Sequence, residues 1–240
     1  MGQYQQAIDA FREILSTQSA ELRVLLTLAQ THLEFGRAQL AASFTARAES
    51  SFVDAINVIL ALVDSSPGFR RIAWKTAADA LFELSRMTNF NDPEPIAVMV
   101  GQVLPLLTNR PQDRLSSLLP PQVESGEPSA SGRSNTLLEA TLHAYSYRST
   151  LGFLDDAAAA SGSYDLSVAL AFYLRRNPSH AKAEEIQKEA VKCMKDAVSW
   201  DPLNDRYWHA LGDLYFLTHP KTAQHAYIKA LEIDNKVRQV

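Results

Sequence analysis

The region from residue 208 to residue 231 carries a pattern of large and small side chains that restricts the fold more than any other feature. Trp208, Leu211 and Tyr215 follow one another at i, i+3 and i+7, which places them on one face of a helix. Gly212 lies beside them and lets a neighbouring helix come close. A second helical segment carries their counterparts, which are Ala223, Tyr227, Ala230 and Leu231. Such a pair buries its apolar stripe only against further pairs, so we expect a stack of helix pairs.

This spacing is the code of the tetratricopeptide repeat, in which two antiparallel helices form one unit. We therefore predict an all-α fold, a tetratricopeptide-repeat solenoid of antiparallel helix pairs with one disordered insertion. Solenoids of this kind hold other molecules on extended surfaces. The residues expected to pack the repeats together are Trp74, Ala78, Trp208, Leu211, Gly212, Tyr215, Ala223, Tyr227 and Ala230, and Trp200 is also assigned to the core.

Weaker versions of the same code occur earlier in the chain. First helices are expected at 25–36, 74–81 and 164–176, and second helices at 41–63, 95–107 and 181–200. The last of these is about two turns longer than the standard second helix, so it offers extra surface. Residues 136–154 are apolar enough for another helix but lack the repeat code.

Residues 109–135 differ in composition from the rest of the chain. Four prolines among many serines and glycines cannot maintain a helical apolar face. We predict a disordered loop there, which separates N-terminal helical repeats at 1–108 from C-terminal helical repeats at 136–240. The first N-terminal unit is incomplete, because residues 4–15 match only a second helix. This half-unit indicates a fragment of a longer chain.

Composition and charge exclude several classes of function. The net charge of -4 over 240 residues gives no overall attraction to nucleic acid or anionic lipid. The longest apolar run, 168–174, is far shorter than the roughly 20 residues that a membrane span needs. Cys193 is the only cysteine, so no internal disulfide forms, and it is expected to be an inert thiol in a helix packing position.

The chain carries no pattern typical of catalysis or metal binding. Its six histidines form no HExxH pair, and one cysteine cannot build a zinc cluster. His209 and Asp213 lie four residues apart on a helix, but the repeat places both in the concave groove, where a polar lining is the simpler interpretation. We predict no enzymatic activity, no cofactor and no metal.

The groove positions of the first helices are the candidate partner contacts. In two repeats these positions hold Lys75 with Asp79 and His209 with Asp213. They contact a partner chain or form a solvated surface. Co-chaperones of this architecture clamp a terminal carboxylate with Lys and Asn at these positions, and an acid in place of the amide would repel that ligand. A carboxylate clamp is therefore disfavoured.

Two blocks of sequence are more specific than the general repeat code. The N-terminal block contains 36–55 and 69–79, and the C-terminal block contains 207–212 and 223–229. In this order they resemble the tetratricopeptide scaffold subunit of the superkiller complex, over roughly residues 2–85 and 160–235.

The resemblance implies a noncatalytic scaffold and no catalytic residues. Such a scaffold organises an RNA helicase and WD40 propeller subunits for cytoplasmic, exosome-linked 3′-to-5′ mRNA decay. Its partners would be these protein subunits, and direct contact with RNA is disfavoured because exposed aromatics do not alternate with the basic pairs. The alternative is a generic tetratricopeptide peptide-binding adaptor, a co-chaperone-like module without a carboxylate clamp.

Overall fold

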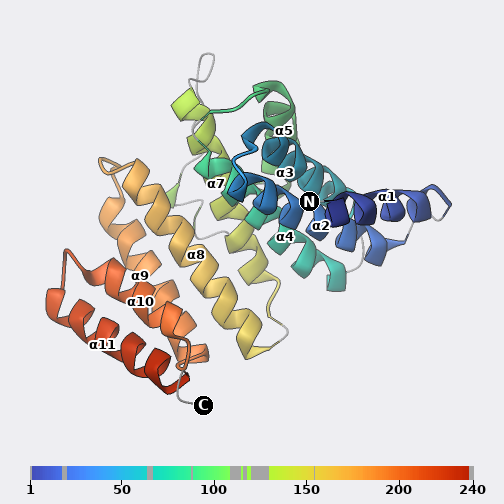
Figure 1. Cartoon of the computed structure of the whole chain (residues 1–240). Coiled ribbons are helices and arrows are strands. Elements are labelled where there is room, and N and C mark those ends of the chain that lie inside the picture. Colours follow the sequence, from blue (N-terminus) through green and yellow to red (C-terminus); the bar gives the residue numbers. More distant parts are fainter. Residues whose placement is uncertain are drawn as a thin grey trace. The chain divides into compact units, whose positions relative to one another are not determined.

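The computed structural model describes residues 2–17, 21–63, 67–87, 89–108, 115, 118–119, 130–153 and 155–237. All regular secondary structure within these ranges is helical (Figure 1). The chain forms two compact units, Met1–Arg148 and Ser149–Val240. Each unit is built from neighbouring helices that pack in pairs. The predicted all-α class of stacked helix pairs is confirmed.

Helix pairing is clearest in the C-terminal unit. Helix α8 (Asp156–Arg176) packs against α9 (Ala183–Trp200), and α10 (Asp205–Tyr215) packs against α11 (Pro220–Val237). Helix α9 also contacts α10, and α8 contacts α10, so the second hairpin stacks on the first. The shared core consists of Met194, Ala197, Val198, Leu211 and Ala226, with Tyr207, Trp208 and Tyr215 packed against it.

Local sequence sets the ends of α8. The Asp155 carboxylate accepts a hydrogen bond of 2.7 Å from the backbone N–H of Ala158, which caps the first turn. Arg175 and Arg176 occupy the last turn, where positive charge is favoured by the helix dipole. Helix α8 thus begins eight residues before the predicted start and ends at the predicted residue.

The N-terminal unit contains a longer run of packed helices. Its helices are α1 (Gly2–Thr17), α2 (Leu22–Ala41), α3 (Thr45–Leu60), α4 (Pro67–Arg86), α5 (Pro93–Thr108) and α7 (Ala130–Thr150), the last of which crosses the unit boundary. Helix α2 contacts α1, α3 and α4, and α3 also contacts α4 and α5. The predicted second helix at 41–63 begins too early, because α2 continues through Ala41 and a turn with Ser43 at φ 65° precedes α3.

One buried carboxylate fixes the start of α5. Glu49 of α3 is 5% exposed and accepts hydrogen bonds of 2.8 and 3.0 Å from the backbone N–H groups of Asn91 and Asp92. Bonds to a charged acceptor are stronger than neutral ones. The segment that leads into Pro93 is therefore tied to α3, although no repeat code marks α5 in the sequence.

The predicted loop at 109–135 lies largely outside the described residues. Within that range, Leu115 and Leu119 are each 2% exposed, and α7 begins at Ala130. The two compact units divide after Arg148, whereas the sequence-based division falls at the loop.

The three tryptophans differ in burial: Trp74 is buried, Trp208 is half-buried against the core, and Trp200 is exposed. Trp74 is 1% exposed and meets Tyr147 edge to face at a centroid distance of 5.6 Å. Trp208 packs against the C-terminal core and donates from Nε1 to the carbonyl oxygen of Pro202 at 2.9 Å. Trp200 is 51% exposed, so its assignment to the core is wrong. It is the last residue of α9, where the chain turns away before it can be covered.

An aromatic ring lies directly on a glycine in one helix pair of each unit. A Cβ added at Gly36 would lie 2.5 Å from the Phe52 ring, and one at Gly212 would lie 2.5 Å from the Tyr227 ring. Both distances are far below van der Waals contact. Phe52 is fully buried, so its ring has no free space to move into.

We expect Gly36→Ala to destabilise the protein by about 1–3 kcal/mol, because the new methyl group overpacks the Phe52 ring. The matched control is Gly101→Ala, another helical glycine but with open space around it, and this change stabilises by about 0.5–1 kcal/mol. Thermal unfolding followed by circular dichroism measures both. Equal increases in Tm would show that the close approach at Gly36 is absent.

Candidate functional site

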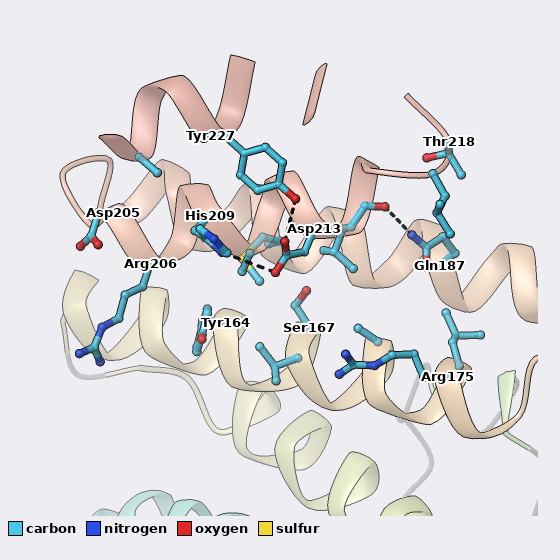
Figure 2. Close-up of a pocket in the computed structure, with 18 of the residues that line it drawn as sticks. Tyr164, Ser167, Arg175, Gln187, Asp205, Arg206, His209, Asp213, Thr218 and Tyr227 are labelled. Atoms are coloured by element: carbon cyan, nitrogen blue, oxygen red, sulfur yellow. Dashed lines mark hydrogen bonds and ion pairs between the residues drawn. The ribbon is translucent and has the colours of Figure 1, made fainter. Parts of the chain in front are cut away.

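A groove of about 1000 Å³ opens in the C-terminal unit, lined by α8, α9, α10 and α11. Its apolar lining includes Val168, Ala171, Leu174, Leu214 and Leu217. Figure 2 shows that Arg206 and Arg175 lie toward opposite ends of the groove, with Tyr164 and Ser167 between them. The groove thus combines an apolar floor with charged groups at its ends.

Helical spacing explains why these side chains share one surface. On α10 and the turn after it, residues 206, 209, 210, 213, 214 and 217 recur at steps of three and four, and α8 contributes 164, 167, 168, 171, 174 and 175 in the same way. Each first helix therefore turns one face to the groove. Ser167 is buried between the helices, where its hydroxyl donates to the carbonyl oxygen of Ala190 at 2.6 Å.

Asp213 is the centre of a polar cluster in this groove. Its Oδ1 accepts a hydrogen bond of 2.7 Å from the Tyr227 hydroxyl, and its Oδ2 lies 3.5 Å from Nδ1 of His209. The His209 and Tyr227 rings also lie close together, with centroids 5.3 Å apart and planes inclined by 60° (Figure 2). Desolvation and then the hydrogen bond to the Asp213 carboxylate raise the pKa of Tyr227 to about 12. The phenol therefore stays a hydrogen-bond donor up to a higher pH than an ordinary tyrosine.

Asp79 in the N-terminal unit repeats this arrangement with different surroundings. Its Oδ1 accepts from the Tyr145 hydroxyl at 2.8 Å, and its Oδ2 lies 3.0 Å from Nζ of Lys75. Arg37 approaches the same Oδ2 at 4.0 Å and also binds Glu83 at 3.1 Å. The Asp79 side chain is 12% exposed, whereas that of Asp213 is 62% exposed. One carboxylate belongs to an internal network and the other faces solvent.

The four candidate partner contacts therefore fall into two kinds of surroundings. His209 and Asp213 line the groove of the C-terminal unit. Lys75 and Asp79 lie in the N-terminal unit, where Asp79 presents little surface. Sequence reasoning missed the α8 wall, especially Tyr164 and Arg175. The spacing of three and four along α8 was a usable signal, since it marks the face that carries both.

The described residues contain no cluster of three or more histidine, cysteine or acidic side chains that is able to hold a metal ion. Cys193, the natural candidate nucleophile, is 7% exposed on α9. Burial and then the nearby carboxylates of Glu189 and Asp196 raise the pKa of its thiol to about 12. A thiol of that pKa supplies almost no thiolate at neutral pH, so it is a poor nucleophile. Among the described helices, none is long and apolar enough to cross a membrane.

Comparison with known proteins supports the architecture. No protein-family model matches the chain. The chain is 22% identical over 232 residues to Superkiller protein 3 of Schizosaccharomyces pombe. The aligned region covers 94% of this chain but only 16% of that protein. A crystal structure of MamA matches all of this chain and 93% of its own, with a TM-score of 0.59 at 15% identity. The fold is a tetratricopeptide-type helical-repeat solenoid.

The solenoid also matches MamA from Desulfovibrio magneticus RS-1 at a TM-score of 0.37 and 16% identity, over 87% of this chain and 96% of that one. Only the match at a TM-score of 0.59 bears on the structure, and it concerns the fold alone. The likeness to Superkiller protein 3 adds that the chain corresponds to about one sixth of that relative's length.

Removing the tyrosine hydroxyls tests whether the stability contributed by each hydrogen bond depends on the burial of its carboxylate. We expect Tyr145→Phe to destabilise the protein by about 1–3 kcal/mol, because it removes the donor to Oδ1 of the mostly buried Asp79, while Lys75 stays bound to Oδ2. Tyr227→Phe costs about 0.5 kcal/mol, since water replaces the donor to the exposed Asp213. Denaturant unfolding, monitored separately for each variant against the unchanged chain, measures both. A Tyr145→Phe variant with an unchanged free energy of unfolding would contradict this account.

Cys193 is a built-in probe of the α9 core, because it is the only thiol. We expect Ellman's reagent at pH 8 to modify the native protein roughly a hundredfold or more slowly than the denatured chain, as burial removes both access and thiolate. Absorbance of the released dye measures the rate. Rapid modification of the native protein would show that α9 does not cover the thiol.

Proposed function

We propose that this chain is a noncatalytic scaffold segment that holds other proteins in the groove of its C-terminal unit. One observation carries the proposal, namely that α8 and α10 direct an apolar floor and charged side chains into a single open groove of about 1000 Å³. Concave surfaces of stacked helix pairs are the usual binding surfaces of solenoids.

The groove offers exposed apolar surface and arginine side chains, both of which a protein ligand can contact. Leu217 lines it and is 90% exposed, so binding would cover apolar surface that now contacts water. Arg175 and Arg206 also line it, and neither forms an ion pair within the part of the chain that the structure describes. Arginines of this kind are frequent anchors in protein interfaces. We infer that a bound segment places apolar side chains on the floor, acidic groups near Arg175 and Arg206, and hydrogen-bond donors near the lining carboxylates of Asp205, Asp213 and Asp234.

The finer proposal concerns the assembly that the scaffold serves. The likeness to Superkiller protein 3 and the two blocks of similar sequence support a cytoplasmic scaffold that organises an RNA helicase and WD40 propeller subunits for exosome-linked 3′-to-5′ mRNA decay. Its partners would be these protein subunits, and it would act without a cofactor. The net charge of -4 gives the chain no overall attraction to RNA phosphates, which favours a protein ligand over RNA.

The alternative is a generic peptide-binding adaptor, and Asp213 supports one version of it. This carboxylate faces the groove at the position where a carboxylate clamp needs a neutral amide. It repels a terminal carboxylate, and the Tyr227 hydrogen bond holds it in place. An adaptor built on this groove therefore binds an internal segment of its ligand.

A pair of matched leucine variants tests the groove. Leu217 lines the groove and Leu203 does not, yet both lie in turns of the same unit and are strongly exposed, at 90% and 77%. We expect Leu217→Asp to weaken capture of the helicase and propeller subunits about tenfold or more, because a charge replaces a covered apolar contact. Leu203→Asp leaves capture within about twofold of the unchanged chain.

Quantitative pull-down of the purified subunits on the full chain measures both variants. Equal capture by Leu217→Asp and Leu203→Asp would remove the groove from the proposal. Binding of these subunits to neither the variants nor the unchanged chain would contradict the assembly, and the adaptor alternative would then be tested with internal peptide segments.

A further inference from the structure

A second hollow, of about 340 Å³, lies in the N-terminal unit among α1, α2 and α3. It shares no residue with the groove. Its polar lining consists mainly of Arg12 from α1, His32 and Gln39 from α2, and Arg47, Ser50 and Asp54 from α3. Ile8 and Phe35 add an apolar part to the lining, so polar groups from three helices meet at one partly apolar hollow.

His32 at this hollow has an unsatisfied polar atom. The residue is 4% exposed, and its Nδ1 has no hydrogen-bond partner among the described residues. The Oδ2 atom of Asp54 is 3.8 Å away, which is too far for a hydrogen bond. A buried polar nitrogen without a partner is costly and uncommon in folded proteins. A partner from outside the protein, either water or a bound molecule, would satisfy it.

The protonation state of His32 restricts the chemistry of that partner. Burial lowers the pKa of His32; Asp54 opposes the shift and Arg12 adds to it. The imidazole is therefore neutral at physiological pH and carries one N–H, and in the Nδ1–H tautomer it donates into the hollow. A group that accepts a hydrogen bond satisfies it.

Two arginines at the same hollow favour negative charge. Arg12 and Arg47 are exposed, and neither forms an ion pair within the described part of the chain. Arg47 instead lies over the Phe44 ring, 5.5 Å from its centroid. The single carboxylate of Asp54 does not balance two guanidinium groups. Planar guanidinium groups bind oxyanions by paired, charge-assisted hydrogen bonds.

We propose that this hollow binds an oxyanion, a carboxylate or a phosphate monoester, carried by a side chain of a protein partner. The oxyanion lies between Arg12 and Arg47 and accepts a hydrogen bond from His32. The site is a second contact point beyond the scaffold groove, in the other compact unit. Small anions test it without any partner of the groove, so the two proposals succeed or fail separately.

The test is a titration of the full chain, followed by nuclear magnetic resonance of the His32 imidazole. The three probes are inorganic phosphate, N-acetyl-phosphoserine and N-acetyl-glutamate, each at constant ionic strength. We expect a saturable shift of the His32 signals. Arg12→Gln and Arg47→Gln each raise the Kd about tenfold, since each removes charge-assisted hydrogen bonds to the anion.

The matched control is Arg23→Gln, which removes the same charge from an exposed position of α2 that does not line the hollow. It leaves the Kd within about twofold of the unchanged chain. Because all three arginines are exposed, the variants keep the fold, and an unchanged Tm verifies this.

Saturation by phosphate and phosphoserine alone supports a phosphorylated partner segment, and saturation by glutamate supports an acidic one. Absence of a saturable His32 shift with all three probes overturns the proposal. An increase in Kd for Arg23→Gln equal to that for the lining variants also overturns it, because binding would then reflect net charge and not this hollow.

Discussion

The contact between an aromatic ring and a glycine on the facing helix is the constraint on which the two clearest helix pairs depend. Phe52 lies on Gly36 in one unit and Tyr227 lies on Gly212 in the other, in each case where a Cβ would approach within 2.5 Å of the ring. The backbone of the first helix can come that close only because a side chain is missing. The ring then sets both the spacing of the helices and the rotation of the second helix about its axis.

In the C-terminal unit this apolar contact also determines the polar geometry of the groove. The Tyr227 ring covers Gly212, and its hydroxyl reaches the carboxylate of the next residue, Asp213, at 2.7 Å. Asp213 in turn faces His209 one turn earlier on α10. Core packing and groove chemistry therefore share one side chain. A change in helix spacing would displace the charged groups that we propose as partner contacts.

The parts of this structure that were predictable from sequence are the local ones. Spacing of three and four residues within α10 and α11 predicted their shared faces, because a helix places such residues together whatever surrounds it. Trp200 was misassigned because helical spacing predicts which face of a helix a residue occupies, but it does not predict whether another helix covers that face. The hollow at His32 draws residues from three helices, and the bonds from Arg37 to Glu83 and from Tyr145 to Asp79 join positions 46 and 66 residues apart. Such pairings depend on how the helices stack, which cannot be predicted from the spacing of residues within one helix.

Asp79 and Asp213 show how one local arrangement leads to two roles. Each lies on a helix, four residues after a basic side chain, and each accepts from a tyrosine on a later helix. Around Asp79 the additional approach of Arg37 and the low exposure leave little of the carboxylate for another molecule, so its contribution is to hold the unit together. Asp213 is 62% exposed, and among the described residues its second oxygen is approached by the exposed His209. Folding has already removed most of the water around the Asp79 carboxylate, whereas the Asp213 carboxylate is still hydrated and would lose its water only when a partner binds. A partner that approaches Asp213 must therefore supply hydrogen-bond donors to replace that water, which is a requirement that selects among ligands.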